Sequence, residues 1–330
     1  IENLLLFEVV LFLFSIKIYH RLNLNVCQSG VHMVGKVVII TGGNSGLGFE
    51  TAKNLAERGA RVIIACRSVR RAEEAVEKII EVTGNKDIEY RHLDLASLSS
   101  IRQFCENILK TEQRVDVLIN NAAAGGLGNY KTEDGNHIGI QVNYFGTFLL
   151  TNLLLPLLKS SAPSRIINLS SMIHKHAKMD FENLNMEKYW SDYLVYANSK
   201  LYINLMTIEL SRRLQGTNVT VNAVHPGIAA TNIFRNIKTK IILNLVSKTV
   251  RFLFLSNWEA AQTTIYLAVS RELQNVSGRY YSNCQEQKPS KLSQDLEIAG
   301  KLWKESEKLT KYTHEIKDVK GTIKDRYSAK

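Results

Sequence analysis

The strongest constraint on the fold of this chain is a glycine-rich turn that joins an apolar run to a helical pattern. The run 36–40 is mostly β-branched and apolar, which predicts a buried strand, and apolar residues at helical spacing follow over 49–58. Glycines let a backbone approach a pyrophosphate, and a helix N-terminus offers that anion free N–H groups. The pattern therefore indicates a dinucleotide site, although an ordinary strand-to-helix turn has the same pattern. The turn consists of Thr41, Gly42, Gly43, Asn44, Ser45, Gly46, Leu47 and Gly48.

Strand and helix patterns alternate along the rest of the chain, with no internal repeat and no Pro- or Gly-rich linker. This alternation predicts an α/β fold: a doubly wound (Rossmann), mostly parallel seven-stranded sheet with helices on both faces and a ligand at the carboxyl ends of the strands. We expect a single domain over 35–310 and a polar tail over 311–330. Strand patterns occupy 36–40, 61–66, 88–93, 115–120, 165–169, 219–224 and 278–281, and helical patterns 49–58, 70–82, 97–110, 136–159, 192–214 and 258–269.

The net charge of +11 comes from basic residues spread along the chain, and no nucleic-acid-binding motif accompanies them. We therefore expect no nucleic-acid partner, and interpret the charge as a solvated face or an attraction to anionic lipid. His174 and His176 have no third ligand nearby in the sequence, so an exposed loop without a metal is expected there. The cysteines lack metal-ligand spacing as well and are expected to be reduced; they are Cys27, Cys66, Cys105 and Cys284.

The N-terminal stretch 3–18 is mostly apolar, which predicts a membrane anchor over 1–21. The stretch is shorter than the roughly 20 residues of a typical span, so it either crosses the bilayer or lies on it. A packed amphipathic helix is the alternative. Lys17, His20 and Arg21 follow the apolar residues, whereas only Glu2 precedes them, and the positive-inside rule then places the folded domain in the cytosol.

Tyr196 and Lys200 lie four residues apart in a helical pattern, so their side chains share one helix face. A tyrosine with a pKa near 10 is a poor base at neutral pH. An ammonium group nearby, together with an oxidised nicotinamide, favours the phenolate and lowers that pKa. The pair therefore fits a proton-transfer site, and a surface pair is the alternative reading.

Further polar residues follow three of the predicted strands. A hydroxyl of Ser170 or Ser171 can hold a substrate oxygen beside a tyrosine, or merely cap a turn. The Asn120-Asn121 pair can support a cofactor or close a turn. Pro226-Gly227, with Thr231 beyond it, is by itself only a turn signal.

Taken together, these motifs resemble those of the short-chain dehydrogenase/reductase family, and most of all its membrane-anchored retinol dehydrogenase branch. The resemblance covers about 35–281. One departure is Ala123, where the family usually has Gly, so that a methyl group could crowd the cofactor; Gly125 and Gly126 follow closely. The motifs are Thr41-Gly-x-x-x-Gly46-x-Gly48, Asp94-Leu95, Asn120-Asn121-Ala122, Asn143, Ser171, Tyr196-x-x-x-Lys200 and Pro226-Gly227-x-x-x-Thr231.

The resemblance implies a catalytic tetrad and a set of cofactor contacts. Tyr196 would exchange a proton with the substrate oxygen, and Ser171, the second serine of its pair, would hold that oxygen. Lys200 would bind the nicotinamide ribose and tune the tyrosine, and Asn143 would keep a water in the proton relay. Hydride would pass directly between cofactor and carbon, with no metal. The implied cofactor contacts are Gly42, Asn44, Ser45, Gly46, Leu47, Gly48, Arg67, Asp94, Leu95, Asn121, Ala122, Tyr196, Lys200, Pro226, Gly227 and Thr231.

The end of the second strand favours NADP(H) over NAD(H). An NAD site usually has an acid about 20 residues after the glycine turn, bound to the ribose 2′-hydroxyl. Here the segment 65–68 has no acid, and Arg67 can pair with a 2′-phosphate, with Arg70 or Arg71 nearby. A solvated arginine before a helix is the alternative.

The sequence therefore predicts an NADP(H)-dependent oxidoreductase that interconverts an apolar alcohol and its aldehyde or ketone, with a retinol/retinal pair as the first choice. Sterol, isoprenoid or lipid-derived carbonyls are alternative substrates, and a cofactor-binding scaffold without turnover is the alternative of another class. Apolar and basic residues over 228–256 fit a substrate lid or a helix packed on the core. The partners expected are a small apolar substrate and a membrane, at the endoplasmic reticulum with the domain facing the cytosol; a homodimer is compatible with this reading.

Overall fold

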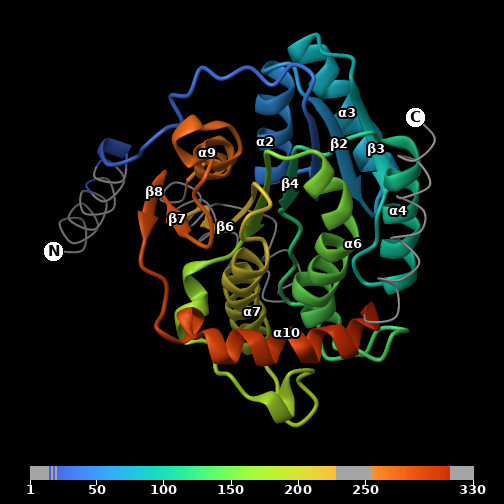
Figure 1. The fold of residues 1–330 in the computed structure, drawn as a ribbon, viewed down its shortest axis with the longest axis vertical. Helices are drawn as coiled ribbons and strands as arrows, with labels where there is room; N and C mark the ends of the chain where they lie inside the picture. Colours follow the sequence, from blue (N-terminus) through green and yellow to red (C-terminus); the bar gives the residue numbers. More distant parts are fainter. Residues whose placement is uncertain (1–14, 16–17, 19–20, 228–254, 313–330) are drawn as a thin grey trace, which may run out of the picture.

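The computed structural model describes residues 15, 18, 21–227 and 255–312, which form one eight-stranded sheet with helices on both faces (Figure 1). The strand order is β3-β2-β1-β4-β5-β6-β7-β8, and all neighbouring pairs are parallel except β7 and β8. The predicted doubly wound sheet is confirmed. Its strands are β1 (Val37–Thr41), β2 (Arg61–Cys66), β3 (Ile88–His92), β4 (Val117–Asn120), β5 (Ser164–Leu169), β6 (Val219–His225), β7 (Tyr280–Ser282) and β8 (Gln285–Gln287).

The eighth strand goes beyond the seven that the sequence predicts. It is the exposed second arm of a hairpin, antiparallel to β7. The two turn residues, Asn283 and Cys284, have φ values of 52° and 55°, as a two-residue turn matched to the strand twist requires. Because Asn-Cys is not the usual Asn-Gly pair, the sequence carries little signal for this hairpin.

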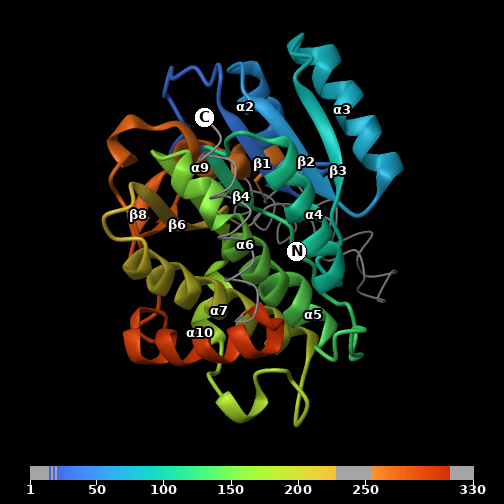
Figure 2. The ribbon, with the colours of Figure 1, turned by 45° about the vertical axis from the view of Figure 1, so that its right-hand side comes forward.

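The helices follow the predicted patterns with two differences. The stretch predicted as one helix over 136–159 is helical over 138–160 but contains a π-helical turn, η1 (Gln141–Phe145), between two α-helical parts. A further helix, α10, lies across the ends of α6 and α7 (Figures 1 and 2). The helices are α2 (Gly46–Glu57), α3 (Val69–Thr83), α4 (Leu98–Thr111), α5 (Ile138–Ile140), α6 (Gly146–Ser160), α7 (Asp192–Arg213), α9 (Asn257–Val269) and α10 (Leu296–Thr310), with short helical turns at Met172–His176, Phe181–Asn183, Arg271–Leu273 and Leu292–Gln294.

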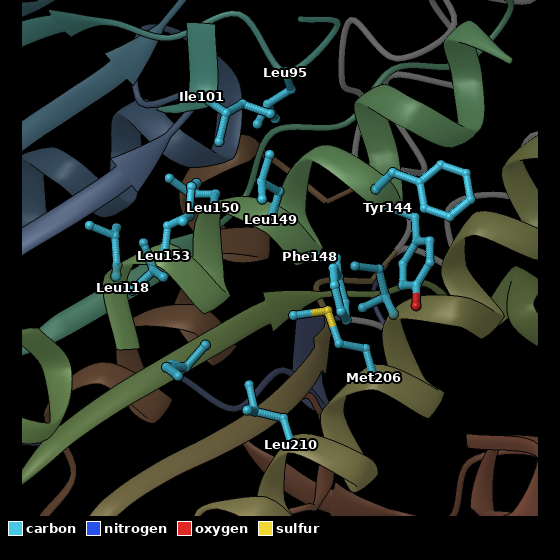
Figure 3. Close-up of a cluster of buried hydrophobic side chains, with 14 of the residues drawn as sticks. Leu95, Ile101, Leu118, Tyr144, Phe148, Leu149, Leu150, Leu153, Met206 and Leu210 are labelled. Carbon is cyan, nitrogen blue, oxygen red and sulfur yellow. The ribbon is translucent and has the colours of Figure 1, made fainter. Parts of the chain in front are cut away.

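Two hydrophobic clusters, one on each face, sandwich the sheet. Successive strand residues point to opposite faces, so Ile39 belongs to the cluster with α4, α6 and α7, while Val38 and Ile40 belong to the cluster with α2, α3 and α9. Figure 3 shows part of the first cluster, where Tyr144 and Phe148 face side chains of α7. Burial of both faces explains the nearly continuous apolar runs of the strands.

Helix α10 is held by its own buried contacts. The Trp303 ring packs edge-on against Phe148 with ring centroids 4.8 Å apart, and the Arg213 guanidinium lies 4.3 Å from the Trp303 ring centroid. The hydroxyl groups of Tyr144 and Ser306, both fully buried, are 2.7 Å apart. These contacts fix α10 to the helices that carry the candidate site.

The chain before β1 also packs on the domain. The backbone N–H of Asn25 donates to the side chain of Asn283 at 2.8 Å, and Arg58 donates to the carbonyl groups of Ser29 and Val31 at 2.6 and 2.9 Å. Most of the predicted anchor over 1–21, nearly all of the predicted lid over 228–256 and the tail beyond Tyr312 lie outside the described residues.

Among the described residues, one helical stretch, Ile138–Ser160, is long and apolar enough to cross a membrane. Its apolar window is 89% buried inside the protein, as expected of a core helix. This stretch therefore gives no support to a membrane span.

We predict that Trp303→Ala lowers the free energy of unfolding by about 3–5 kcal/mol, since it removes a buried ring that packs on Phe148. Leu296→Ala, on the same helix at a position 58% exposed, should change it by less than about 0.5 kcal/mol. Urea unfolding of both variants measures the difference. Equal effects at the two positions would show that α10 is not anchored by its buried face.

Candidate active site

The carboxyl ends of the parallel strands gather the predicted site residues at one edge of the sheet. The strand order reverses between β1 and β4, the switch point where open α/β sheets bind ligands. The glycine turn follows β1 at this point. Gly42 and Gly46 have φ values of 67° and 58°, which favour glycine, and a Cβ on Gly48 would collide with the Gly42 carbonyl oxygen.

The first turn of α2 is available to an anion. Ser45 stands at the N-cap, but its side chain makes no capping hydrogen bond, and the first turn contains no acidic residue. The backbone N–H groups of Gly46, Leu47 and Gly48 therefore remain free to donate to a ligand. A pyrophosphate at this turn stays a prediction.

Thr41 ties the glycine turn to the end of β4. Its Oγ1 accepts hydrogen bonds from the backbone N–H groups of Asn121 and Ala122, both at 2.9 Å. The Asn121 side chain donates in return to the Thr41 carbonyl at 2.8 Å. The Asn-Asn-Ala segment thus links the end of β4 to the end of β1, next to the glycine turn.

Arg67 and Asp94 face each other after β2 and β3, with the closest guanidinium nitrogen and carboxylate oxygen 3.9 Å apart. The Arg67 side chain is 68% exposed, and the Asp94 carboxylate also accepts from the N–H of Ala96 at 2.9 Å. Leu95 is buried, and its carbonyl oxygen lies 2.7 Å from where a Cβ on Gly146 would stand. Close approach of α6 to this segment therefore requires glycine at 146.

Tyr196 and Lys200 share one face of α7, as predicted. The Lys200 Nζ lies 5.4 Å from the centre of the Tyr196 ring and donates to the carbonyl of Leu169, at the end of β5, at 2.8 Å. Burial lowers the pKa of Lys200 to about 7. Burial also raises the pKa of Tyr196, so in the protein alone the phenol rather than the phenolate is favoured.

The two serines after β5 have different surroundings. The Ser170 hydroxyl is buried and donates to the carbonyl of Lys200 at 3.3 Å. Ser171 is half-buried, and its Oγ makes a capping contact to the N–H of Ile173 at 3.4 Å. The hydroxyl of Ser171 is therefore the one that remains more accessible.

The prediction of an exposed loop at His174 is wrong, whereas His176 is exposed. The His174 ring is buried against Tyr280, its Nδ1 lies 2.6 Å from the Ser171 carbonyl oxygen, and its Nε2 accepts from the N–H of Ser290 at 3.0 Å. This places the proton on Nδ1. Burial lowers the pKa of His174, in keeping with a neutral ring that braces the Ser171 segment. Among the described residues, no group of three or more side chains could hold a metal.

Asn143 lies in the π-helical turn and is buried. Its side chain accepts from the N–H of Ala124 at 2.8 Å and donates to the carbonyl of the same residue at 2.9 Å. It also donates to Ser199, whose hydroxyl bonds the backbone of Tyr196. π-Turns are frequent at functional sites because they displace backbone groups from the regular ladder.

The end of β6 completes the described part of the site. Gly227 has a φ of 84°, and a Cβ there would lie 2.5 Å from Leu255, so the turn after Pro226 requires glycine. Burial lowers the pKa of the preceding His225 to about 4, and its Nδ1 has no partner among the described residues. Thr231 lies outside the described part of the chain.

A buried polar chain behind the site was not predicted. The Asn120 amide donates to Thr151 of α6 at 2.9 Å and to the Asn168 side chain of β5 at 2.8 Å, and Asn168 donates to Thr207 of α7 at 3.0 Å. The sequence signal for this chain of hydrogen bonds is an asparagine within each of two apolar strand runs, because a buried side-chain amide needs hydrogen-bond partners.

Comparisons with known proteins agree with this geometry. The family model described as short chain dehydrogenase matches residues 36–241. The chain is 47% identical over 287 residues to mouse retinol dehydrogenase 13, covering 86% of each chain, and 47% identical over 289 residues to human retinol dehydrogenase 14, covering 83% of this chain and 86% of that one.

Solved structures show the same fold. An uncharacterised protein from Mycobacterium paratuberculosis superposes with a TM-score of 0.71 at 33% identity, over 87% of this chain and 98% of that one. The L-sorbose reductase of Gluconobacter frateurii, solved with NADPH and L-sorbose, superposes with a TM-score of 0.60 at 21% identity, over 77% and 97%. The chain is therefore an oxidoreductase that belongs to the short-chain dehydrogenase/reductase family, in its retinol dehydrogenase branch.

Proposed function

We propose that this oxidoreductase uses NADP(H) to interconvert an apolar alcohol and its aldehyde or ketone, with a retinol/retinal pair as the first candidate. The observation that carries the proposal is the placement of Tyr196 and Lys200 on one face of α7, with Lys200 bonded to the end of β5 beside Ser171. Relatives at 47% identity that are named retinol dehydrogenases support the substrate class.

In this proposal Tyr196 donates a proton to the substrate oxygen during reduction and removes it during oxidation. Ser171 holds the same oxygen, because its hydroxyl is the more accessible of the pair. The glycine turn and Lys200 would hold NADP(H), which would supply or accept the hydride. A charged Lys200 would oppose the burial that raises the pKa of Tyr196, and an oxidised nicotinamide held beside it would act in the same direction.

Asn143 takes a positioning role in the same scheme. Its Nδ2 donates to Ala124 and Ser199 and its Oδ1 accepts from Ala124, so it holds the loop after β4 against α7. A relay water at Asn143 would then bind the remaining lone pair of Oδ1 or a main-chain group of the π-turn.

The preference for NADP(H) rests on Arg67. It is exposed, it stands where NAD sites carry an acid, and its contact with Asp94 is long at 3.9 Å, so it is able to turn to a 2′-phosphate. Arg70, by contrast, is paired with Glu74 at 3.4 Å. The complex of L-sorbose reductase with NADPH shows that a protein of this fold binds that cofactor.

Exposed aromatic side chains between Ser171 and Tyr196 support an apolar substrate and a membrane surface; they are Tyr189, Trp190 and Tyr193. We propose an anchor over 1–21, a lid over 228–256 that includes the cofactor contact Thr231, and a location at the endoplasmic reticulum membrane with the domain facing the cytosol. Sterol, isoprenoid or lipid-derived carbonyls remain alternative substrates, and a homodimer an alternative to a monomer.

The first test is the chemistry. Tyr196→Phe should lower kcat on retinal or decanal by about 10²–10⁴, the usual contribution of a general acid–base group, with little change in NADPH affinity. Absorbance of NADPH gives kcat, and fluorescence titration gives its Kd. A variant with the wild-type rate would contradict the role of Tyr196, and a wild type inert on every apolar aldehyde and alcohol would favour the scaffold alternative.

The second test separates the two serines. Ser171→Ala should lower kcat/KM by about 10²–10³, as removal of one donor to a reacting oxygen does. Ser170→Ala should keep kcat/KM within about threefold while losing roughly 1 kcal/mol of stability, because its hydroxyl serves the Lys200 carbonyl. Reversed effects on kcat/KM would move the role to Ser170.

The third test is cofactor choice. Arg67→Ala should lower kcat/KM for NADPH by about 10- to 100-fold, since a charge-assisted hydrogen bond contributes roughly 1.5–3 kcal/mol, while NADH should be much less affected. Arg67→Asp should lower the NADPH/NADH ratio further by repelling the phosphate. A constant ratio across wild type and both variants would leave Arg67 a solvated charge and turn attention to Arg71.

A further inference from the structure

Beside Tyr196 lies a small, narrow hollow between the loop after β4 and the start of α7. The hollow is too narrow to admit a water molecule. One wall is the loop after β4, which contains Gly126 and Gly128, and another is the start of α7. His137, Asp192 and Tyr196 belong to the lining.

His137 is the one histidine in this lining, and the residue is only 3% exposed. Its Nδ1 accepts a hydrogen bond from the N–H of Gly139 at 3.1 Å, which caps α5. In the neutral ring the proton therefore lies on Nε2. Burial lowers the pKa of His137, so the neutral form is the favoured one.

The Nε2–H has no hydrogen-bond partner among the described residues, although its atom is buried. A buried donor without an acceptor is unfavourable, and the hollow leaves no room for a water to accept its hydrogen bond. The backbone of His137 is nevertheless held firmly, because its N–H donates to the Asn185 side chain at 2.6 Å and its carbonyl accepts from Gln141 at 2.8 Å. The ring is thus fixed beside Tyr196 with an unused donor.

We propose that His137 Nε2–H binds a second oxygen of the substrate, apart from the oxygen that reacts at Tyr196. Asp192 lines the same hollow, so a neutral acceptor such as an ether, hydroxyl or carbonyl oxygen is favoured over an anion. The substrate class is then an apolar aldehyde or alcohol with one further neutral oxygen on its chain. The inference rests on the proposed function. Asn143 holds the loop at Ala124, so the part beyond it, with Gly126 and Gly128, would have to move for the substrate chain to enter.

Two variants test the roles of the two ring nitrogens of His137 separately. His137→Asn keeps an acceptor near the position of Nδ1, and hence the cap on α5, but has no group near Nε2. His137→Gln keeps an N–H donor near Nε2 but loses the cap. The substrates are decanal and a set of its mono-methoxy derivatives, with the ether oxygen moved one carbon at a time along the chain.

In the wild type, at least one methoxy derivative should exceed decanal in kcat/KM by about three- to tenfold, the value of one neutral hydrogen bond. His137→Asn should reduce that ratio to about one, whereas His137→Gln should retain most of it despite a lower Tm. The Kd of NADPH should not change. The inference is overturned if no derivative exceeds decanal, if the ratio survives in His137→Asn, or if His137→Asn weakens NADPH binding instead.

Binding measurements keep the test independent of turnover. The Trp190 ring lies 6.3 Å from the His137 ring, so its fluorescence should report filling of the hollow. If decanal binds but is never reduced, the proposed function fails while the affinity ratio between methoxy derivative and decanal still decides the role of His137. If decanal is reduced and the affinity ratio is the same in wild type and His137→Asn, the function stands and this inference fails.

Discussion

A buried amide pair at the centre of the sheet fixes the parts on which the site depends. Asn120 and Asn168 bond side chain to side chain across β4 and β5, and each reaches a threonine on a different helix, Thr151 on α6 and Thr207 on α7. All four side chains are buried. At buried positions, losing a hydrogen bond costs more free energy than forming one contributes. The pair therefore sets the positions of α6 and α7 relative to the strand ends.

The position of the site residues on α7 depends on these hydrogen bonds. Lys200 and Tyr196 stand about two and three helical turns before Thr207, and Lys200 makes its own bond to the end of β5. On the other side of the site, Thr41 binds β1 to the segment after β4 with two accepted hydrogen bonds. Hydrogen bonds thus position both the glycine turn and the active-site face of α7 relative to β4, which adjoins the switch point of the sheet.

Much of this arrangement could be predicted from the sequence, because it depends on local patterns. Alternating strands and helices, the glycine turn and the Tyr196/Lys200 spacing are short-range signals, and each identifies its element without knowledge of the rest. The hairpin turn at Asn283 and the π-turn around Asn143 could not be predicted, because tertiary packing selects them over the commoner geometry. The burial of His174 depends on Ser290, more than a hundred residues away in sequence, which no local pattern reveals.

At the carboxyl ends of the strands, burial of Lys200 costs the folded protein stability. Lys200 has a pKa of about 7 in the folded chain against 10.5 for the free side chain, so between these values the folded protein binds fewer protons than the unfolded one. Its contribution to stability therefore falls as the pH falls from about 10.5 toward 7.

Unpaired buried atoms lie near the same edge. His225 Nδ1 follows β6, and Asn257 Oδ1, 3.9 Å from where a Cβ on Gly46 would stand, adjoins the glycine turn. Polar groups without partners are rare in folded proteins and are expected where a ligand completes the structure. The His225 and Asn257 atoms are two of the buried polar atoms that have no partner among the described residues, and a ligand bound at the carboxyl ends of the strands would offer them one.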